Sequence, residues 1–122
     1  MANIAKNEER EDRLYNEIIV DANDEEEQAM GWWNYLDECF HPPFRARSIA
    51  TRIISPLRKG EEMTVTGMAP ESECLHEMFV IIQWEDRSFA VPLAQLEAID
   101  ADDDTIEAIA DWHFWVARGY QL

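Results

Sequence analysis

The sequence predicts an α+β fold: two N-terminal helices, a small antiparallel β-barrel-like sheet of four to five strands, and a C-terminal helix. Two observations lead to this prediction. Apolar residues recur at helical spacing near both ends of the chain, whereas the middle holds short strand-type runs separated by turn residues. A length of 122 residues with 47% hydrophobic residues suits one core, so we expect residues 1–122 to form a single domain.

Two helices are expected before the strands. The first is predicted over residues 7–20, where Leu14 and Ile18 lie on one apolar stripe. The second is predicted to begin at Asp24, because this side chain can cap free amides and Glu27 follows at capping-box spacing. It should end by residue 41, before two prolines. Its apolar face is predicted to be Ala29, Trp33, Leu36 and Phe40, widened by Met30 and Trp32.

The middle of the chain reads as an antiparallel meander. Four runs have the composition of strands and are separated by Pro, Gly and acidic turns: residues 46–54, 62–68, 78–84 and 89–93. Strands this short tend to curl into a barrel, because closure hides their edges.

A last helix is predicted over residues 104–119. Ile106, Ile109 and Val116 recur at helical spacing, and Asp104 with Glu107 repeats the capping arrangement. His113 lies on the same stripe, so we interpret it as a hydrogen-bonded core residue rather than a ligand.

Charge narrows the possible functions. The chain has 26 acidic and 10 basic residues, a formal net charge of −16. Nucleic acids and anionic membranes bind basic surfaces, so neither is an expected direct partner. The sequence shows no signal peptide and no membrane-spanning apolar run, and we therefore expect a cytoplasmic protein whose Cys39 and Cys74 remain thiols.

A surplus of carboxylates suits calcium, which binds six to eight oxygens from carboxylates, backbone carbonyls and water. The preferred candidates are Asp37 and Glu38 at the end of the second helix. Carboxylates there oppose the helix dipole unless a cation compensates. The alternative is that both are solvated surface charges.

Two further clusters are candidate calcium ligands. Asp100, Asp102 and Asp104 alternate as the first ligands of an EF-hand do, but Thr105 replaces the required glycine. An acidic first turn that favours the helix dipole is the alternative interpretation. Folding could also bring two other acids to the end of the second helix, namely Glu73 and Glu77.

Other site chemistries fit poorly. Cys39 with His41, and Cys74 with His76, would give four zinc ligands, but only one residue separates each pair. No nucleophile elbow, phosphate-binding glycine loop or zinc-protease motif is present, so we do not expect an enzyme.

Six segments resemble the CcbP family of small acidic calcium-binding proteins from heterocyst-forming cyanobacteria. They are residues 16–22 (NEIIVDA), 29–36 (AMGWWNYL), 55–61 (SPLRKGE), 78–84 (MFVIIQW), 90–96 (AVPLAQL) and 111–115 (DWHFW). The resemblance covers nearly the whole chain.

The resemblance implies a cytoplasmic calcium buffer with several sites of unequal affinity, which keeps free calcium low until the protein is removed during cell differentiation. Asp37 occupies the acidic position of the family after the Trp-Trp-x-Tyr-Leu block, and the resemblance implies a ligand role for it. The alternative function is an acidic interaction protein that masks the basic surface of a nucleic-acid-binding partner.

Overall fold

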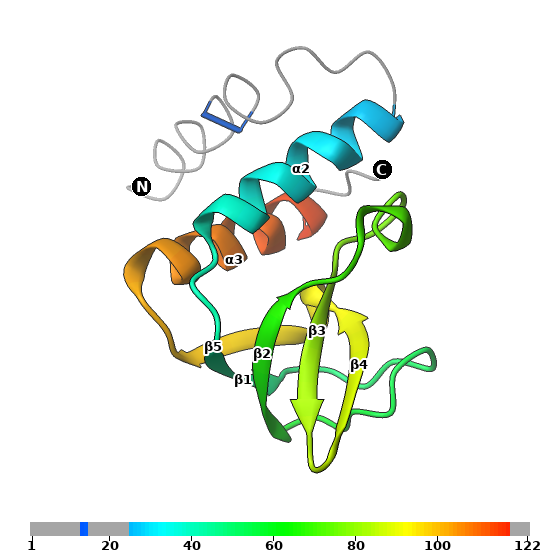
Figure 1. The fold of residues 1–122 in the computed structure, drawn as a ribbon, viewed down its shortest axis with the longest axis vertical. Helices are drawn as coiled ribbons and strands as arrows, with labels where there is room; N and C mark the ends of the chain where they lie inside the picture. Colours follow the sequence, from blue (N-terminus) through cyan, green and yellow to red (C-terminus); the bar gives the residue numbers. More distant parts are fainter. Residues whose placement is uncertain (1–12, 15–24, 118–122) are drawn as a thin grey trace.

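The computed structural model describes residues 13–14 and 25–117 (Figure 1). Within these residues the longer elements follow in the order α2 (Glu25–Cys39), β1 (Phe44–Ser48), β2 (Glu62–Met68), β3 (Phe79–Trp84), β4 (Arg87–Pro92), β5 (Leu96–Asp100) and α3 (Asp103–Ala117). Two short 3-10 helices, η1 (Glu71–Glu73) and η2 (Leu93–Gln95), complete the order. The described residues share one hydrophobic core.

The strands form one antiparallel sheet in the order β4-β3-β2-β1-β5. The α+β class is confirmed, but the barrel-like closure predicted from the sequence is wrong. β4 and β5 are the two edges, joined in sequence by η2, and the sheet is open. Closure is not needed to bury the apolar face, because α2 and α3 form a helical layer over one end of the sheet (Figure 1).

The strand boundaries match the prediction in part. The strand at residues 62–68 is confirmed, whereas the first strand begins at Phe44 and ends at Ser48 rather than spanning 46–54. The chain leaves the sheet there because the buried Gln95 side chain donates to the carbonyls of Ala50 (2.9 Å) and Leu57 (3.3 Å). This clamp holds both ends of the 50–57 loop. β5 was not among the four predicted runs.

Tryptophans join the two helices. Trp32 is fully buried and contacts Trp112 edge-on, with ring centroids 5.0 Å apart, and Trp115 at 5.6 Å. Two of the three predicted helices, the second and the last, are confirmed within the described residues, α2 over Glu25–Cys39 and α3 over Asp103–Ala117. Trp33 differs from the prediction. It is only partly buried, and its Nε1 donates to the Ala69 carbonyl at 2.8 Å.

The helix predicted over 7–20 lies outside the described residues, except for Arg13 and Leu14. Both are helical, and Leu14 is fully buried in the core. No helix in the described ranges is long and apolar enough to span a membrane.

Candidate metal centre

The end of α2 leaves two backbone carbonyls without their usual partners. The His41 amide, which would continue the helix by donating to Asp37, donates instead to Thr105 Oγ1 at 3.1 Å. Pro42 has no N–H to donate to the carbonyl of Glu38. No described residue donates a hydrogen bond to either carbonyl oxygen. Within the described residues, both oxygens therefore lack a donor, which for the last carbonyls of a helix is commonly supplied by solvent, by a side chain or by a ligand.

The side chains at this helix end carry negative charge. Asp37 and Glu38 are both exposed, and the last turn of α2 contains no basic residue. Within residues 13–14 and 25–117, neither carboxylate forms an ion pair. A helix C-terminus carries about half a negative charge, so these acids add to an unfavourable potential that a cation would relieve.

The first turn of α3 lies against the end of α2. Thr105 Oγ1 accepts from the His41 amide and donates to the Cys39 carbonyl at 3.4 Å. Asp102 is the N-cap of α3, because its Oδ1 accepts from the Thr105 amide at 2.9 Å, whereas the sequence placed the cap at Asp104. Thr105 is thus the residue that joins the two helix ends, and its only sequence signal was its position after the acidic run.

The pKa values reflect the charge at this junction. A hydrogen bond from His41 Nδ1 to Asp102 Oδ2 raises the pKa of His41, and the charges of Asp102 and Asp104 raise it further. Bonds from Thr105 and His41 lower the pKa of Asp102 to about 2. Burial raises the pKa of the Cys39 thiol, with smaller contributions from the charges of Asp104 and Glu38. Acids of both helices therefore act on the same small region.

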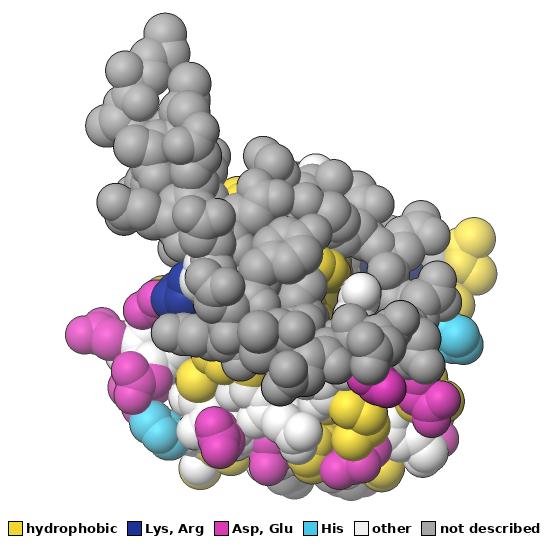
Figure 2. Space-filling view, turned by 90° about the horizontal axis from the view of Figure 1, so that it is seen from above, with side chains coloured by type: hydrophobic (Ala, Val, Ile, Leu, Met, Phe, Trp, Pro, Cys, Tyr) yellow, Lys and Arg dark blue, Asp and Glu magenta, His cyan; other side chains and the backbone are white. Residues whose placement is uncertain are grey.

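The space-filling view agrees with this description. Acidic side chains and a histidine gather at the edge that lies on the same side of the molecule as the start of α3 (Figure 2). A pocket of about 440 Å³ opens beside the junction and brings Asp100 and Asp102 together. It is lined by His41, Pro43, Phe44, Arg45, Thr64, Asp100, Ala101 and Asp102.

The acids of the 71–77 segment are not part of this junction. Figure 1 shows the loop between β2 and β3 on the opposite side of the molecule from the end of α2. Glu77 is paired with Arg52 through two hydrogen bonds of 2.5 and 3.1 Å. Glu73 is exposed in η1. Folding does not bring either acid to Asp37.

The junction fits a hard cation through a mixed set of oxygens. Among the described residues, no group of three or more His, Cys, Asp or Glu side chains is arranged to hold a metal ion. A cage made only of carboxylates is therefore not preformed. Calcium also accepts backbone carbonyls and water, and its coordination is flexible. Free carbonyls beside exposed carboxylates are consistent with that chemistry.

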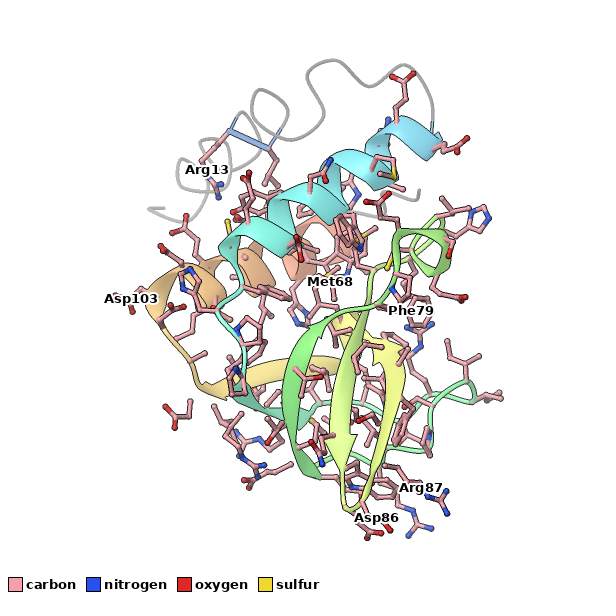
Figure 3. The ribbon with its side chains drawn as sticks, viewed as in Figure 1. Arg13, Met68, Phe79, Asp86, Arg87 and Asp103 are labelled. Carbon is pink, nitrogen blue, oxygen red and sulfur yellow. The ribbon has the colours of Figure 1, made fainter. Side chains whose placement is uncertain are left out.

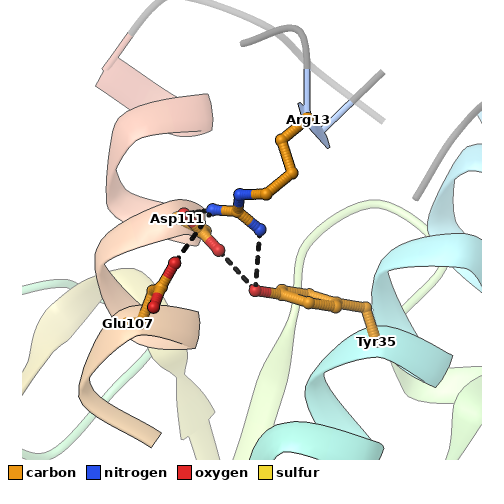
Figure 4. A network of polar contacts seen from close by, with 4 residues as sticks. All are labelled: Arg13, Tyr35, Glu107 and Asp111. Carbon is orange, nitrogen blue, oxygen red and sulfur yellow. Dashed lines mark hydrogen bonds and ion pairs between the residues drawn. The ribbon is translucent and has the colours of Figure 1, made fainter. Parts of the chain in front are cut away.

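A second polar cluster lies farther along the same helices and was not predicted. Asp111 is fully buried and accepts hydrogen bonds from Arg13, at 2.6 Å, and from the Tyr35 hydroxyl (Figure 4). Arg13 also forms an ion pair with Glu107 at 3.4 Å. Burial and the bond to Asp111 raise the pKa of Tyr35. Here a guanidinium already compensates the acid, so this cluster joins Arg13 to α2 and α3 rather than offering a metal site.

Comparison with known proteins identifies the family. The model of a calcium-binding family, CcbP, matches residues 12–116. The crystal structure of Anabaena CcbP is 46% identical, has a TM-score of 0.83, and is covered over 94% of both chains. A calcium-binding protein in its calcium-binding form is 45% identical, with a TM-score of 0.82 and complete coverage of both chains. A comparison with curated proteins gives no match. The family and the second structure identify the ion as Ca²⁺, and the chain belongs to the CcbP family of calcium-binding proteins.

Proposed function

We propose that this chain is a cytoplasmic calcium buffer that holds Ca²⁺ where the end of α2 meets the start of α3. The observation that supports this site most strongly is that no described residue donates to the carbonyls of Asp37 and Glu38, which lie beside two exposed carboxylates in a helix turn without a basic residue. A bound cation would offset both the acids and the helix dipole.

The proposed ligands fall into two groups. Asp37 and Glu38 would supply carboxylate oxygens, their carbonyls are free to contribute, and water would complete the shell. Asp100, Asp102 and Asp104 come from the neighbouring segments and would act mainly through their charge. Asp102 already caps α3 and bonds to His41, so it is the least free of these acids. When bound, the ion would supply positive charge and would tie the two helix ends together.

Buffering follows from the charge and from the kind of ligand. A net charge of −16 raises the local cation concentration, and a site that keeps several waters exchanges its ion readily. We further propose that release or removal of this buffer regulates free Ca²⁺ during cell differentiation, as the sequence resemblance implies. We propose no catalytic role.

Calorimetric titration with Ca²⁺ tests the site. Asp37→Asn should weaken calcium binding by about tenfold, equivalent to ~1.4 kcal/mol, because it removes a charged ligand while preserving shape. Asp86→Asn is the matched control. Asp86 is also exposed, but it lies at the tip of the β3–β4 hairpin, far from Asp103 at the start of α3 (Figure 3). Equal affinities in the two variants would refute the site.

Competition by magnesium and binding to a basic protein complete the experiment. Magnesium should compete weakly, since it requires a tighter octahedral shell. A chain that binds no Ca²⁺ but captures basic proteins in a salt-sensitive way would support the acidic interaction protein instead.

A further inference from the structure

An apolar groove lies between α3 and the edge strand β5. It has a volume of about 540 Å³, and its walls are mostly apolar side chains from β5, from α3 and from the segment after β1. They are Ile49, Glu97, Ala98, Ile106, Ile109, Ala110, His113, Phe114 and Ala117. The described lining residues include one acid and no Lys or Arg. The calcium junction shares none of these residues.

α3 is apolar on two faces, which is unusual for a surface helix. One face buries Ala108, Trp112 and Trp115 in the core. The other face contributes four residues to the groove at helical spacing: Ile106, Ala110, His113 and Ala117. Ile106 remains 46% exposed. A surface helix normally turns polar residues outward, so a second apolar face along a groove marks an interaction site.

The opposite wall is an edge strand. β5 pairs with β1 on one side, and no described strand pairs with its other side. The His113 side chain donates from Nε2 to the Leu96 carbonyl at 2.6 Å, which covers the first position of the strand. Glu97 and Ala98 follow along the groove, and Ile99 is 37% exposed. This edge is apolar and only partly protected.

Charge indicates which partner fits the groove. Asp100 ends β5 and Asp103 begins α3, while Glu97 in the groove wall is paired with Arg47 of β1 at 2.8 Å. The whole chain has a formal net charge of −16. A basic partner is therefore attracted, and a second copy of this chain or an anionic lipid surface is repelled.

We propose that the groove docks a short amphipathic segment of a partner protein, with apolar side chains in the groove and Lys or Arg along its rim. The stripe from Ile106 to Ala117 is about 16 Å long at 1.5 Å per residue, room for about three turns of a docked helix. This is the helix-in-groove mode of recognition, in which apolar residues at helical spacing anchor the segment. The inference does not depend on the calcium site.

Fluorescence anisotropy with a labelled Leu-Lys model peptide, patterned as an amphipathic helix, tests the proposal on the full chain. A scrambled peptide of the same composition separates apolar docking from charge attraction. The variant Ile106→Lys places a like charge in the groove. Its matched control, Ile53→Lys, makes the same change on an isoleucine that is fully exposed in the 50–57 loop, outside the groove.

The parent should bind the amphipathic peptide more tightly than the scrambled one. Ile106→Lys should weaken this binding by about tenfold or more, as loss of an interface anchor does, and Ile53→Lys should leave it within about twofold. Ile49→Lys alters the groove from outside α3 and should weaken binding as much as Ile106→Lys does. This agreement would show that the loss in Ile106→Lys does not come from a defect in the helix.

Three results would overturn the proposal. Equal binding of the two peptides, or equal losses in Ile106→Lys and Ile53→Lys, would show attraction by charge alone. Sedimentation showing a dimer of the parent that Ile106→Lys dissociates would assign the groove to a second copy instead.

Discussion

Arg13 compensates a fully buried carboxylate, and its removal should be costly. Asp111 is 0% exposed, and Arg13 donates to it at 2.6 Å from a side chain that is 27% exposed. Breaking a buried pair by removing one partner costs about 3–5 kcal/mol, because the other charge stays buried. The Tyr35 hydroxyl still donates to Asp111, so we expect the lower end, about 3 kcal/mol, for Arg13→Ala. Loss of the exposed Glu107 contact should add less than about 1 kcal/mol.

Urea and thermal unfolding without calcium measure this cost. A loss of about 3 kcal/mol should lower the Tm by roughly 10 °C in a chain of this size. The matched control is Arg87→Ala. Arg87 is exposed at the β3–β4 hairpin, well away from Arg13 (Figure 3), and this variant should stay within about 0.5 kcal/mol of the parent. If Arg13→Ala and Arg87→Ala unfold at the same urea concentration and the same temperature, the buried pair does not stabilise the fold as described.

Three further predictions concern the helix junction and the loop clamp. Because the pKa of His41 is raised, its contact with Asp102 stabilises the fold below pH 6.5, and this stabilisation is lost as the pH rises through the raised pKa. Because the pKa of Asp102 is lowered, the same contact stabilises the fold above pH 3.8, and this stabilisation is lost as the pH falls toward about 2. NMR titration should show the His41 pKa falling in Asp102→Asn, and an unchanged value would contradict the contact. Gln95→Leu should destabilise the fold by about 2 kcal/mol, because two carbonyls lose their buried donor, and should speed hydrogen exchange in the 50–57 loop; unchanged urea unfolding would refute the clamp. Thr105→Val should weaken calcium binding without removing any acid, whereas Thr66→Val, on the exposed side of β2, should not; equal calorimetric affinities would show that the joined helix ends are unnecessary for binding.

The sequence predicted the elements better than their arrangement. Helical spacing located α2 and α3 because each buries a continuous apolar stripe, and strand-type composition between turn residues located β2 at residues 62–68. The end of β1 was not predictable, since Gln95 pulls the chain out of the sheet across a long sequence separation. The open sheet was missed for a similar reason. Local patterns show that strands have a buried face, but not whether a helix layer or strand closure covers it.

The candidate site was predictable in the same limited way. Asp37 and Glu38 were recognisable because acids are unfavourable at a helix C-terminus, which is a local signal. The role of Thr105 was not, because the partners of its hydroxyl lie in α2 and in the turn that follows it. Asp102 and Asp104 were both noted as acids, but only the folded geometry shows that Asp102 is the cap.

A calcium titration followed by two-dimensional NMR of the backbone amides tests the location of the site most directly. Asp37–His41 and Asp102–Thr105 should show the largest shifts, which should saturate together, while the β3–β4 hairpin and the groove along β5 remain unchanged. Shifts concentrated instead around Glu71–Glu77, or an unchanged spectrum at Asp37 and Thr105 in saturating calcium, would contradict binding at the junction of α2 and α3.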